Sequence, residues 1–327
     1  MKQKTDMKGF AGAGMRLNIL SDRDVNRIHE STLAVLSETG IWVESQEALH
    51  CFKEGGARVD ESRRIVKLPP QLVEDAIASA PGRVYLAGRH AAHDLVLDGK
   101  RVHFTNFSEG VKLNDPDTGV NREPVKADLV KAARLIDALD EIDFCEKAIG
   151  AHDVPQQSVP LHNAEAFLSH TTKHCAFGPG NGRLLNKIVA MAAVIAGGFR
   201  QLMDRPLVSF TTCPVSPLKL ISDCCDIIMA SARNGMVCNI LSMAMAGATA
   251  PVSLAGTLVT HNAEILSGLT LSQIIRKGTP VIYGSSTTAM DLRFAQAAVG
   301  TPECALISGA VARLARYYAL PSYVAGG

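Results

Sequence analysis

Val237-Cys-Asn-Ile-Leu241 is an apolar run without charged residues, and Val281-Ile-Tyr-Gly284 is a second one further along the chain. The segment between them, Leu254–Ile275, is long enough for a helix and contains a single acidic residue. Strands that are apolar on both faces are typical of parallel sheets, in which other layers cover both faces. The order strand, helix, strand therefore predicts a βαβ unit.

The same alternation extends from this unit in both directions. We predict further strands at Val102–Phe104, Phe144–Ile149, His174–Phe177, Leu207–Thr212 and Ser322–Ala325. We predict helices at Lys126–Leu139, His162–Ser169, Leu184–Ala196, Leu218–Ala232 and Pro302–Tyr318. Strict alternation of this kind indicates a parallel sheet that is either open or closed into a barrel.

Two glycine-rich segments bear on the choice between these architectures. Gly9–Gly14 precedes every predicted strand, and Gly178–Gly182 follows one, but neither has the spacing of a nucleotide-binding loop. We therefore predict an α/β fold in which residues 101–327 form a parallel (β/α)8 TIM-type barrel. Seven strands are predicted where a closed barrel needs eight, so we expect this barrel to be incomplete at the C-terminus.

Residues 1–100 have a different rhythm and predict a separate N-terminal α+β segment. Ser21 and Asp24 have capping-box spacing before an apolar stripe, which indicates a helix that ends at Gly40. The elements expected after it are helices at Gln46–Lys53 and from Pro69 to about Ala80, and extended segments at Ala57–Val59, Ile65–Leu68 and Val84–Leu86.

The composition excludes several classes of protein. Thirty-three Lys and Arg against 32 Asp and Glu give a net charge of +1, which argues against nucleic-acid binding. Only 20% of residues are charged and 47% are hydrophobic, so we expect a large core and allow for a homo-oligomer interface. The eight cysteines have no regular spacing and no signal peptide is evident, which favours reduced thiols in the cytoplasm. The uncharged stretch from Asn234 to Ala263 holds Asn, Pro and Gly residues, and we interpret it as a buried strand and helix rather than a membrane span.

Catalytic residues of barrel enzymes lie at the carboxyl ends of the strands. That rule selects residues that are mostly polar and uncharged: Thr105, Asn106, Thr211, Cys213, Ser216, Ser242, Met243, Tyr283 to Thr288 and the segment after Val324. We predict no metal site, because His170 and His174 lack the glutamate of the zinc-protease motif and Cys224-Cys225 has no partner pair. Cys213 has no identifiable base beside it, so a buried thiol is the favoured interpretation.

Two stretches stand out among the polar residues. Thr260-His-Asn-Ala-Glu264 interrupts an apolar helix, and Glu264 is the first acidic residue after Asp226. A buried carboxylate must be paired or protonated, so this residue is either part of an active site or on a helix face turned to solvent or to a neighbouring helix. Tyr283-Gly-Ser-Ser-Thr-Thr288 places a row of hydroxyl groups after one strand, as either a site or a capped loop.

The same segments carry a resemblance to a known family. The motifs are Cys213-Pro-Val-Ser-Pro-Leu218, Ser242-Met-Ala-Met245, Leu254 to Glu264, Tyr283 to Thr288 and Leu320-Pro-Ser-Tyr-Val-Ala-Gly326, and Ile65–Arg89 adds an N-terminal block. In this order they resemble the trimethylamine:corrinoid methyltransferase family, whose trimethylamine members contain pyrrolysine. The resemblance covers essentially the whole chain.

The resemblance implies a barrel enzyme that transfers a methyl group from trimethylamine to Co(I) of a corrinoid, as in methanogenesis from trimethylamine. The corrinoid would be supplied by a cognate partner protein, and this chain would bind no cofactor tightly. Glu264 and Tyr283 would be catalytic, facing the barrel cavity and stabilising the cationic nitrogen. The substrate-binding residues would be Ser242, His261, Asn262, Ser285, Ser286, Thr287 and Thr288.

The resemblance also implies a pyrrolysine directly after Gly327, encoded by an amber codon, so that the 327-residue chain would be a truncated and inactive fragment. Two alternatives stay open. One is a corrinoid methyltransferase without pyrrolysine that acts on a quaternary amine such as glycine betaine. The other is a non-catalytic subunit that only binds the corrinoid protein. The nucleotide sequence after the Gly327 codon distinguishes them.

Overall fold

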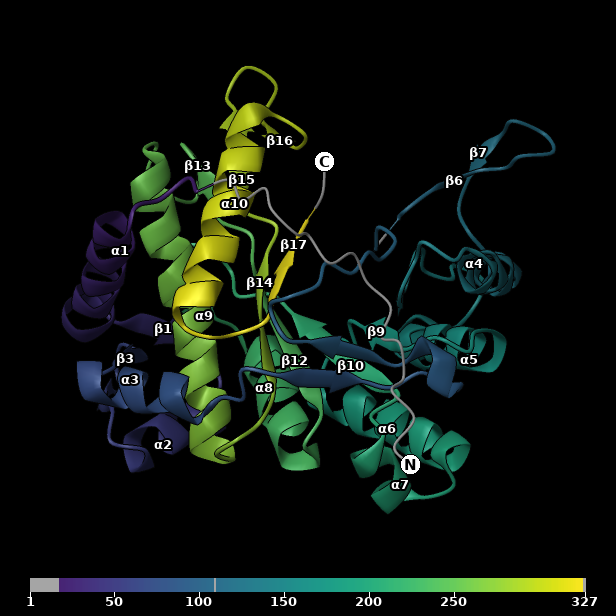
Figure 1. Ribbon diagram of the computed structural model, residues 1–327, viewed down its shortest axis with the longest axis horizontal. Helices are drawn as coiled ribbons and strands as arrows, with labels where there is room; N and C mark the ends of the chain where they lie inside the picture. Colours follow the sequence, from purple (N-terminus) through teal and green to yellow (C-terminus); the bar gives the residue numbers. More distant parts are fainter. Residues whose placement is uncertain (1–17, 109, 326–327) are drawn as a thin grey trace. The chain divides into compact units, whose positions relative to one another are not determined.

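The computed structural model describes residues 18–108 and 110–325, and its contacts divide the chain into two compact units (Figure 1). Unit 1 is the continuous segment Val84–Thr211 in its described part, and unit 2 combines the residues before Val84 with those from Thr212 onward. The sequence predicts a single division, near residue 100, whereas unit 2 combines two separate segments of the chain. The boundary near residue 100 stays a prediction.

The N-terminal part of unit 2 is the mixed structure that the sequence predicts. Helix α1 (Asp22–Ala34) begins at a complete capping box, because the Ser21 hydroxyl accepts from the Asp24 amide and the Asp24 carboxylate accepts from the Ser21 amide. A π-helical turn, Val35–Thr39, follows it and ends at Gly40, whose φ is 81°. The remaining elements are β1 (Ile41–Val43), α2 (Gln46–Glu54), β2 (Arg58–Asp60), β3 (Ile65–Lys67) and α3 (Pro70–Ser79).

The C-terminal part of unit 2 contains three parallel strands, β12 (Val237–Ser242), β14 (Val281–Ser285) and β17 (Ser322–Val324), with β14 in the middle. Their connections are helical, as predicted from the alternation. The helices are α8 (Ser222–Asn234), α9 (Leu254–Ile275) and α10 (Pro302–Tyr317). The short strand β11 (Lys219–Leu220) pairs in parallel with β1.

Helix α9 is the centre of the core of unit 2. It packs against α1, α2, α3, α8 and α10 (Figure 1). Most of its side chains are buried. A helix that is apolar all round can be stable in water only when neighbours cover its whole circumference. The uncharged stretch from residue 234 to 263 is thus the strand β12, the short strand β13 (Met245–Ala246) and the first half of a core helix. No helix in the described ranges is long and apolar enough to cross a membrane.

Unit 1 also has three parallel strands, β8 (Cys145–Glu146), β9 (Cys175–Phe177) and β10 (Val208–Thr212), with β9 in the middle. Its helices are α4 (Lys126–Ala138), α5 (Val159–His170), α6 (Gly182–Ala196) and α7 (Phe199–Asp204). Two small antiparallel pairs complete it: β4 (Val84–Leu86) with β5 (Leu95–Leu97), and β6 (Leu113–Asn114) with β7 (Asn121–Arg122).

The chain is therefore an α/β protein with parallel strands in each unit. One predicted strand is wrong: Val102–Phe104 is not a strand, although Val102 is a bridge residue and Thr105 beyond it forms an isolated parallel bridge to Phe144. The apolar run misled the prediction because Val102 and Phe104 are 52% and 59% exposed rather than covered on both faces. A second difference is that part of the predicted polar loop after β14 is strand β15 (Thr288–Asp291), which pairs with β16 (Gln296–Ala298).

Candidate active site

Two strand ends meet at one edge of the sheet in unit 2. Ser242 ends β12 and Ser285 ends β14, and the two residues are direct partners in the parallel register. The amide of Ser286 donates to the carbonyl of Ser242 at 2.9 Å, so the chain leaving β14 is tied to the end of β12. This edge is the carboxyl end of the strands, where barrel enzymes place their catalytic residues.

Glu264 reaches this edge from α9 and is only 1% exposed. Its Oε2 accepts from the hydroxyls of Ser242 at 2.6 Å and Ser216 at 2.9 Å, and its Oε1 accepts from the amide of Leu218 at 3.0 Å. The carboxylate thus joins the end of β12 to the Cys213–Leu218 segment that follows β10. Sequence reasoning named Glu264, Ser242 and Ser216 separately but did not predict that they contact one another, because Ser216 lies 48 residues from Glu264 along the chain.

The environment of Glu264 changes its acidity. Burial disfavours the charged form and raises the pKa of the carboxyl, while the hydrogen bonds from Ser242, Leu218 and Ser216 oppose that effect. The net result is a pKa above the ordinary value of glutamic acid. A carboxyl group of this kind can hold a proton closer to neutral pH than an exposed one and can exchange it through the attached hydroxyls.

His261 lies one turn before Glu264 and is fully buried. Its Nδ1 is 3.0 Å from the hydroxyl of Thr287, which also lies 3.3 Å from the carbonyl of Ser242. Burial lowers the pKa of His261 to about 3, so the ring is neutral at physiological pH. Its Nε2 has no hydrogen-bond partner among the described residues. The amide of Thr287 donates to the hydroxyl of Ser285 at 3.1 Å, which fixes the turn after β14.

Tyr283 and Asn262 form a separate group with residues of the helical layer. The Tyr283 hydroxyl donates to Asn262 Oδ1 at 2.7 Å, and Asn262 Nδ2 donates to the hydroxyls of Thr32 and Tyr318. Tyr283 is fully buried in the core together with α9 and α10 residues, and burial raises its pKa well above the usual value. The Tyr283 hydroxyl is thus held by α9, while its ring lies edge-on to that of His261, with the ring centroids 5.3 Å apart. That Tyr283 contacts the substrate stays a prediction.

The predicted site residues thus divide between two places. Ser242, His261, Glu264, Ser285, Ser286 and Thr287 gather at the carboxyl edge of β12 and β14. Thr288 turns away, since its hydroxyl donates to the carbonyl of Ala298 in the β15–β16 pair at 2.8 Å. The roles predicted for Thr288, Tyr283 and Asn262 stay predictions.

Sequence reasoning missed two buried acids in unit 1: Asp128, which pairs with Arg122, and Glu146. Glu146 lies at the carboxyl end of β8 and is 6% exposed. The backbone amide of Glu146 donates to Asn106 Oδ1 at 3.0 Å, and its backbone carbonyl accepts from Asn106 Nδ2 at 2.9 Å. The signal in the sequence is weaker here than at Glu264, because Lys147 follows Glu146 directly and Asp143 lies three residues before it.

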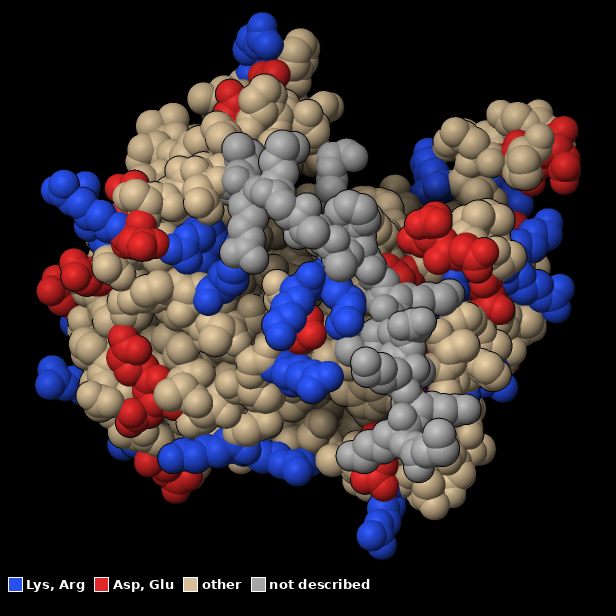
Figure 2. Space-filling view, in the orientation of Figure 1, with Lys and Arg blue, Asp and Glu red and all other residues tan. Residues whose placement is uncertain are grey.

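The residues considered from the sequence as metal ligands have other surroundings in the structure. His174 bonds to the carbonyls of Ala87 and Pro206, His170 bonds to the carbonyl of Ala166, and Cys224 and Cys225 are buried free thiols. Within the described part of the chain, no three His, Cys, Asp or Glu residues come together as metal ligands. Figure 2 shows Lys and Arg scattered among Asp and Glu on the visible face, with wide uncharged areas between them.

Comparison with known proteins identifies the family to which the chain is similar. A profile described as trimethylamine methyltransferase (MTTB) matches residues 2–327. The chain is 48% identical over 321 residues to the trimethylamine methyltransferase MttB of Desulfitobacterium hafniense (strain DSM 10664 / DCB-2), covering 98% of this chain and 64% of that protein. It is 40% identical to MttB of Methanosarcina thermophila, covering 100% of this chain and 69% of that protein.

A more distant relative is a glycine betaine methyltransferase of Desulfitobacterium hafniense (strain Y51), 33% identical over 95% of this chain and 65% of that protein. Among solved structures, the monomethylamine methyltransferase MtmB of Methanosarcina barkeri is similar in fold, with a TM-score of 0.54 at 16% identity over 95% of this chain and 69% of that one. The chain spans about two thirds of the length of these relatives. Since the family profile covers it almost from end to end, the chain belongs to the trimethylamine methyltransferase family.

Proposed function

We propose that the protein is a trimethylamine:corrinoid methyltransferase, which moves one methyl group from trimethylamine to Co(I) of a corrinoid carried by a partner protein. The 48% identity to a trimethylamine methyltransferase supports this substrate over glycine betaine, whose methyltransferase is 33% identical. The corrinoid, as the methyl acceptor, is a second substrate. We also propose that the full-length protein contains pyrrolysine and forms a closed (β/α)8 barrel. Cytoplasmic location and homo-oligomerisation stay predictions.

The observation that carries the proposal at the residue level is the buried carboxyl of Glu264 at the carboxyl edge of β12 and β14. Transfer of a methyl group breaks its bond to nitrogen, and the nitrogen keeps the electron pair, so the amine leaves well only while the nitrogen carries positive charge. A carboxyl with a raised pKa can hold the proton that this requires. Ser216, which is half-buried, connects the carboxyl of Glu264 to the outer side of the site.

Ser242, Ser285, Ser286, His261 and Thr287 would set the shape of this edge. The neutral His261 holds the Thr287 hydroxyl, and Thr287 in turn lies against the end of β12. Rigid positioning of two reactants can contribute several kcal/mol to catalysis. We infer that these residues orient the amine, whereas Tyr283 and Asn262 act indirectly, by fixing α9 against β14.

The test is Glu264→Gln in the full-length protein. The amide retains the size of the side chain but cannot exchange a proton, so we expect methyl transfer to fall at least tenfold, about 1.4 kcal/mol of transition-state stabilisation. Methylation of the corrinoid partner is measured at saturating trimethylamine from the change in absorbance of the corrinoid. Glu303→Gln, an exposed acid at the start of α10, is the matched control.

Unchanged turnover in Glu264→Gln would assign this residue to structure alone. The same assay with glycine betaine in place of trimethylamine tests the alternative substrate. Turnover of glycine betaine alone would replace the proposed function with the second candidate, and turnover of neither amine would support the non-catalytic subunit.

A further inference from the structure

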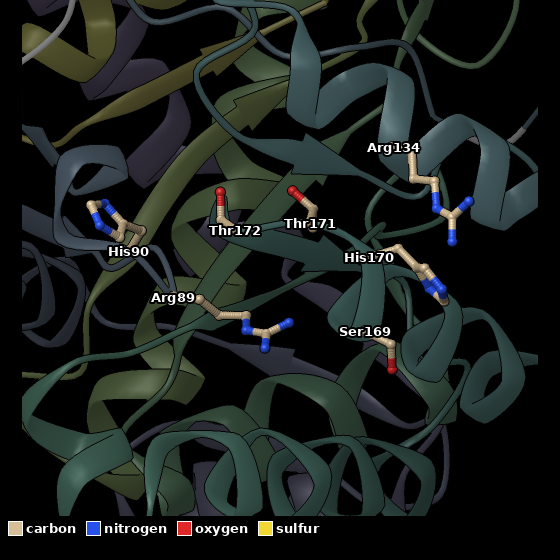
Figure 3. Close-up of a pocket in the computed structure, with 7 residues that line it drawn as sticks. All are labelled: Arg89, His90, Arg134, Ser169, His170, Thr171 and Thr172. Atoms are coloured by element: carbon tan, nitrogen blue, oxygen red, sulfur yellow. The ribbon is translucent and has the colours of Figure 1, made fainter.

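A cavity of about 490 Å³ lies in unit 1, before the first residue of β9 (Figure 3). The lining residues Ser169 to Thr172 lie where α5 ends, before β9 begins, and Arg89 comes from the segment after β4 and Arg134 from the C-terminal half of α4. Barrel enzymes use the opposite end of their strands for catalysis. The cavity is therefore independent of the site around Glu264.

The lining of this cavity is positively charged. Two guanidinium groups and two imidazoles line it, and no carboxylate is among the described lining residues. Figure 3 shows Arg134 and His170 next to each other, with Ser169 beside them and Arg89 across from them. Neither Arg89 nor Arg134 forms an ion pair with another described residue within 4 Å.

The charged groups behind the lining do not cancel this charge. The Asp137 carboxylate accepts from the amide of Thr172 at 2.7 Å and from the hydroxyls of Thr171 and Thr172. Lys173 is buried and donates to the carbonyls of Ile136 and Leu139 at the end of α4. One anion and one further cation thus lie behind the two arginines.

Two of the four charged or imidazole side chains of the lining, Arg89 and His170, are held in place before a ligand arrives. Arg89 Nη1 donates to the carbonyl of Leu168 at 2.9 Å, which fixes the guanidinium at the end of α5 and leaves its other N–H groups for a ligand. His170 Nδ1 donates to the carbonyl of Ala166 at 2.8 Å, so Nε2 is the ring nitrogen that a ligand can use. A pre-organised site binds more tightly because less side-chain entropy is lost.

We propose that this cavity binds a phosphate group, either as free phosphate or as a phosphate monoester. Arginine forks match the oxygens of phosphate, and the Ser169 hydroxyl adds a neutral donor. Hydrogen phosphate can both donate and accept a hydrogen bond at Nε2 of His170, whereas sulfate and acetate can only accept one. Phosphate is therefore favoured over other anions of the same charge.

The experiment is titration calorimetry of the full-length protein with inorganic phosphate, glycerol phosphate, sulfate and acetate at one ionic strength. We expect saturable binding of phosphate at one site, weakened at least about tenfold by Arg134→Gln, which removes a charge-assisted bond without breaking a contact to another described residue. Arg200→Gln, which removes an exposed charge on α7 outside the cavity, should bind like the wild type. Arg89→Gln should weaken binding as well, and its thermal unfolding shows whether the end of α5 stays intact.

Tighter binding of inorganic phosphate than of glycerol phosphate would identify free phosphate as the ligand, and the reverse order would identify a phosphorylated small molecule. No saturable binding, equal binding of sulfate, or equal losses in Arg134→Gln and Arg200→Gln would overturn the proposal. Because this experiment measures binding and not methyl transfer, its failure can be distinguished from failure of the proposed function.

Discussion

Gly284 in β14 has no Cβ, and this leaves space for the side chain of Asn239 on β12. A Cβ at this position would lie 2.2 Å from Asn239 Oδ1 on β12 and 2.8 Å from the carbonyl of Ile240. Alternation along β14 puts Gly284 on the face opposite Tyr283 and directly before Ser285. Close approach of the two strands beside the candidate site therefore depends on glycine.

We expect Gly284→Ala to lower the free energy of unfolding by about 1–3 kcal/mol, because backbone on β12 as well as a side chain must move to admit the methyl group. Urea unfolding followed by circular dichroism measures the change. Gly150→Ala is the control, since a Cβ there meets nothing within 4 Å. Equal stability of the two variants would mean that β12 and β14 separate easily.

At the scale of elements, a single buried histidine joins three segments of unit 1. His174 precedes β9, its Nδ1 donates to the carbonyls of Ala87 at 3.2 Å and Pro206 at 3.1 Å, and its Nε2 accepts from the Ser209 hydroxyl of β10 at 2.9 Å. Burial lowers the pKa of His174 to about 4, although the two carbonyls oppose that effect. The neutral ring is thus the form that holds these segments together.

The lowered pKa predicts sensitivity to acid. Because the folded pKa lies below the unfolded value of about 6.5, the contribution of His174 is complete above pH 6.5 and is lost as the pH falls toward 4. We expect about 3 kcal/mol of unfolding free energy to disappear over this range from His174 alone. Urea midpoints between pH 7 and pH 4 measure it.

In His174→Gln this part of the pH dependence should be missing, although the variant is less stable at pH 7. His50→Gln, at a side chain that is 66% exposed, should keep the wild-type pH dependence. An unchanged slope in His174→Gln would show that other groups cause the acid sensitivity.

At the scale of the whole molecule, the sequence predicted most elements but not all of their contacts. Helix α9 has the predicted bounds because its apolar run begins and ends at clear signals, and α1 begins at the predicted capping box. The β15–β16 pair was missed because its residues show no alternation of apolar and polar side chains. Of the candidate site, the strand-end rule located Ser242 and Ser285, whereas the contact of Ser216 with Glu264 depends on tertiary structure that no local pattern encodes.

The position of α9 in the core of unit 2 has a consequence for synthesis on the ribosome. Helices α1 and α3 bury their apolar faces against α9, whose first residue is made roughly 175 residues after the end of α3. At 5–20 residues per second that interval is on the order of ten to thirty-five seconds. During this time the continuous segment Val84–Thr211 can fold as it emerges, while the N-terminal helices must wait with their apolar faces uncovered. The nascent chain is thus a substrate for chaperones until α9 leaves the exit tunnel.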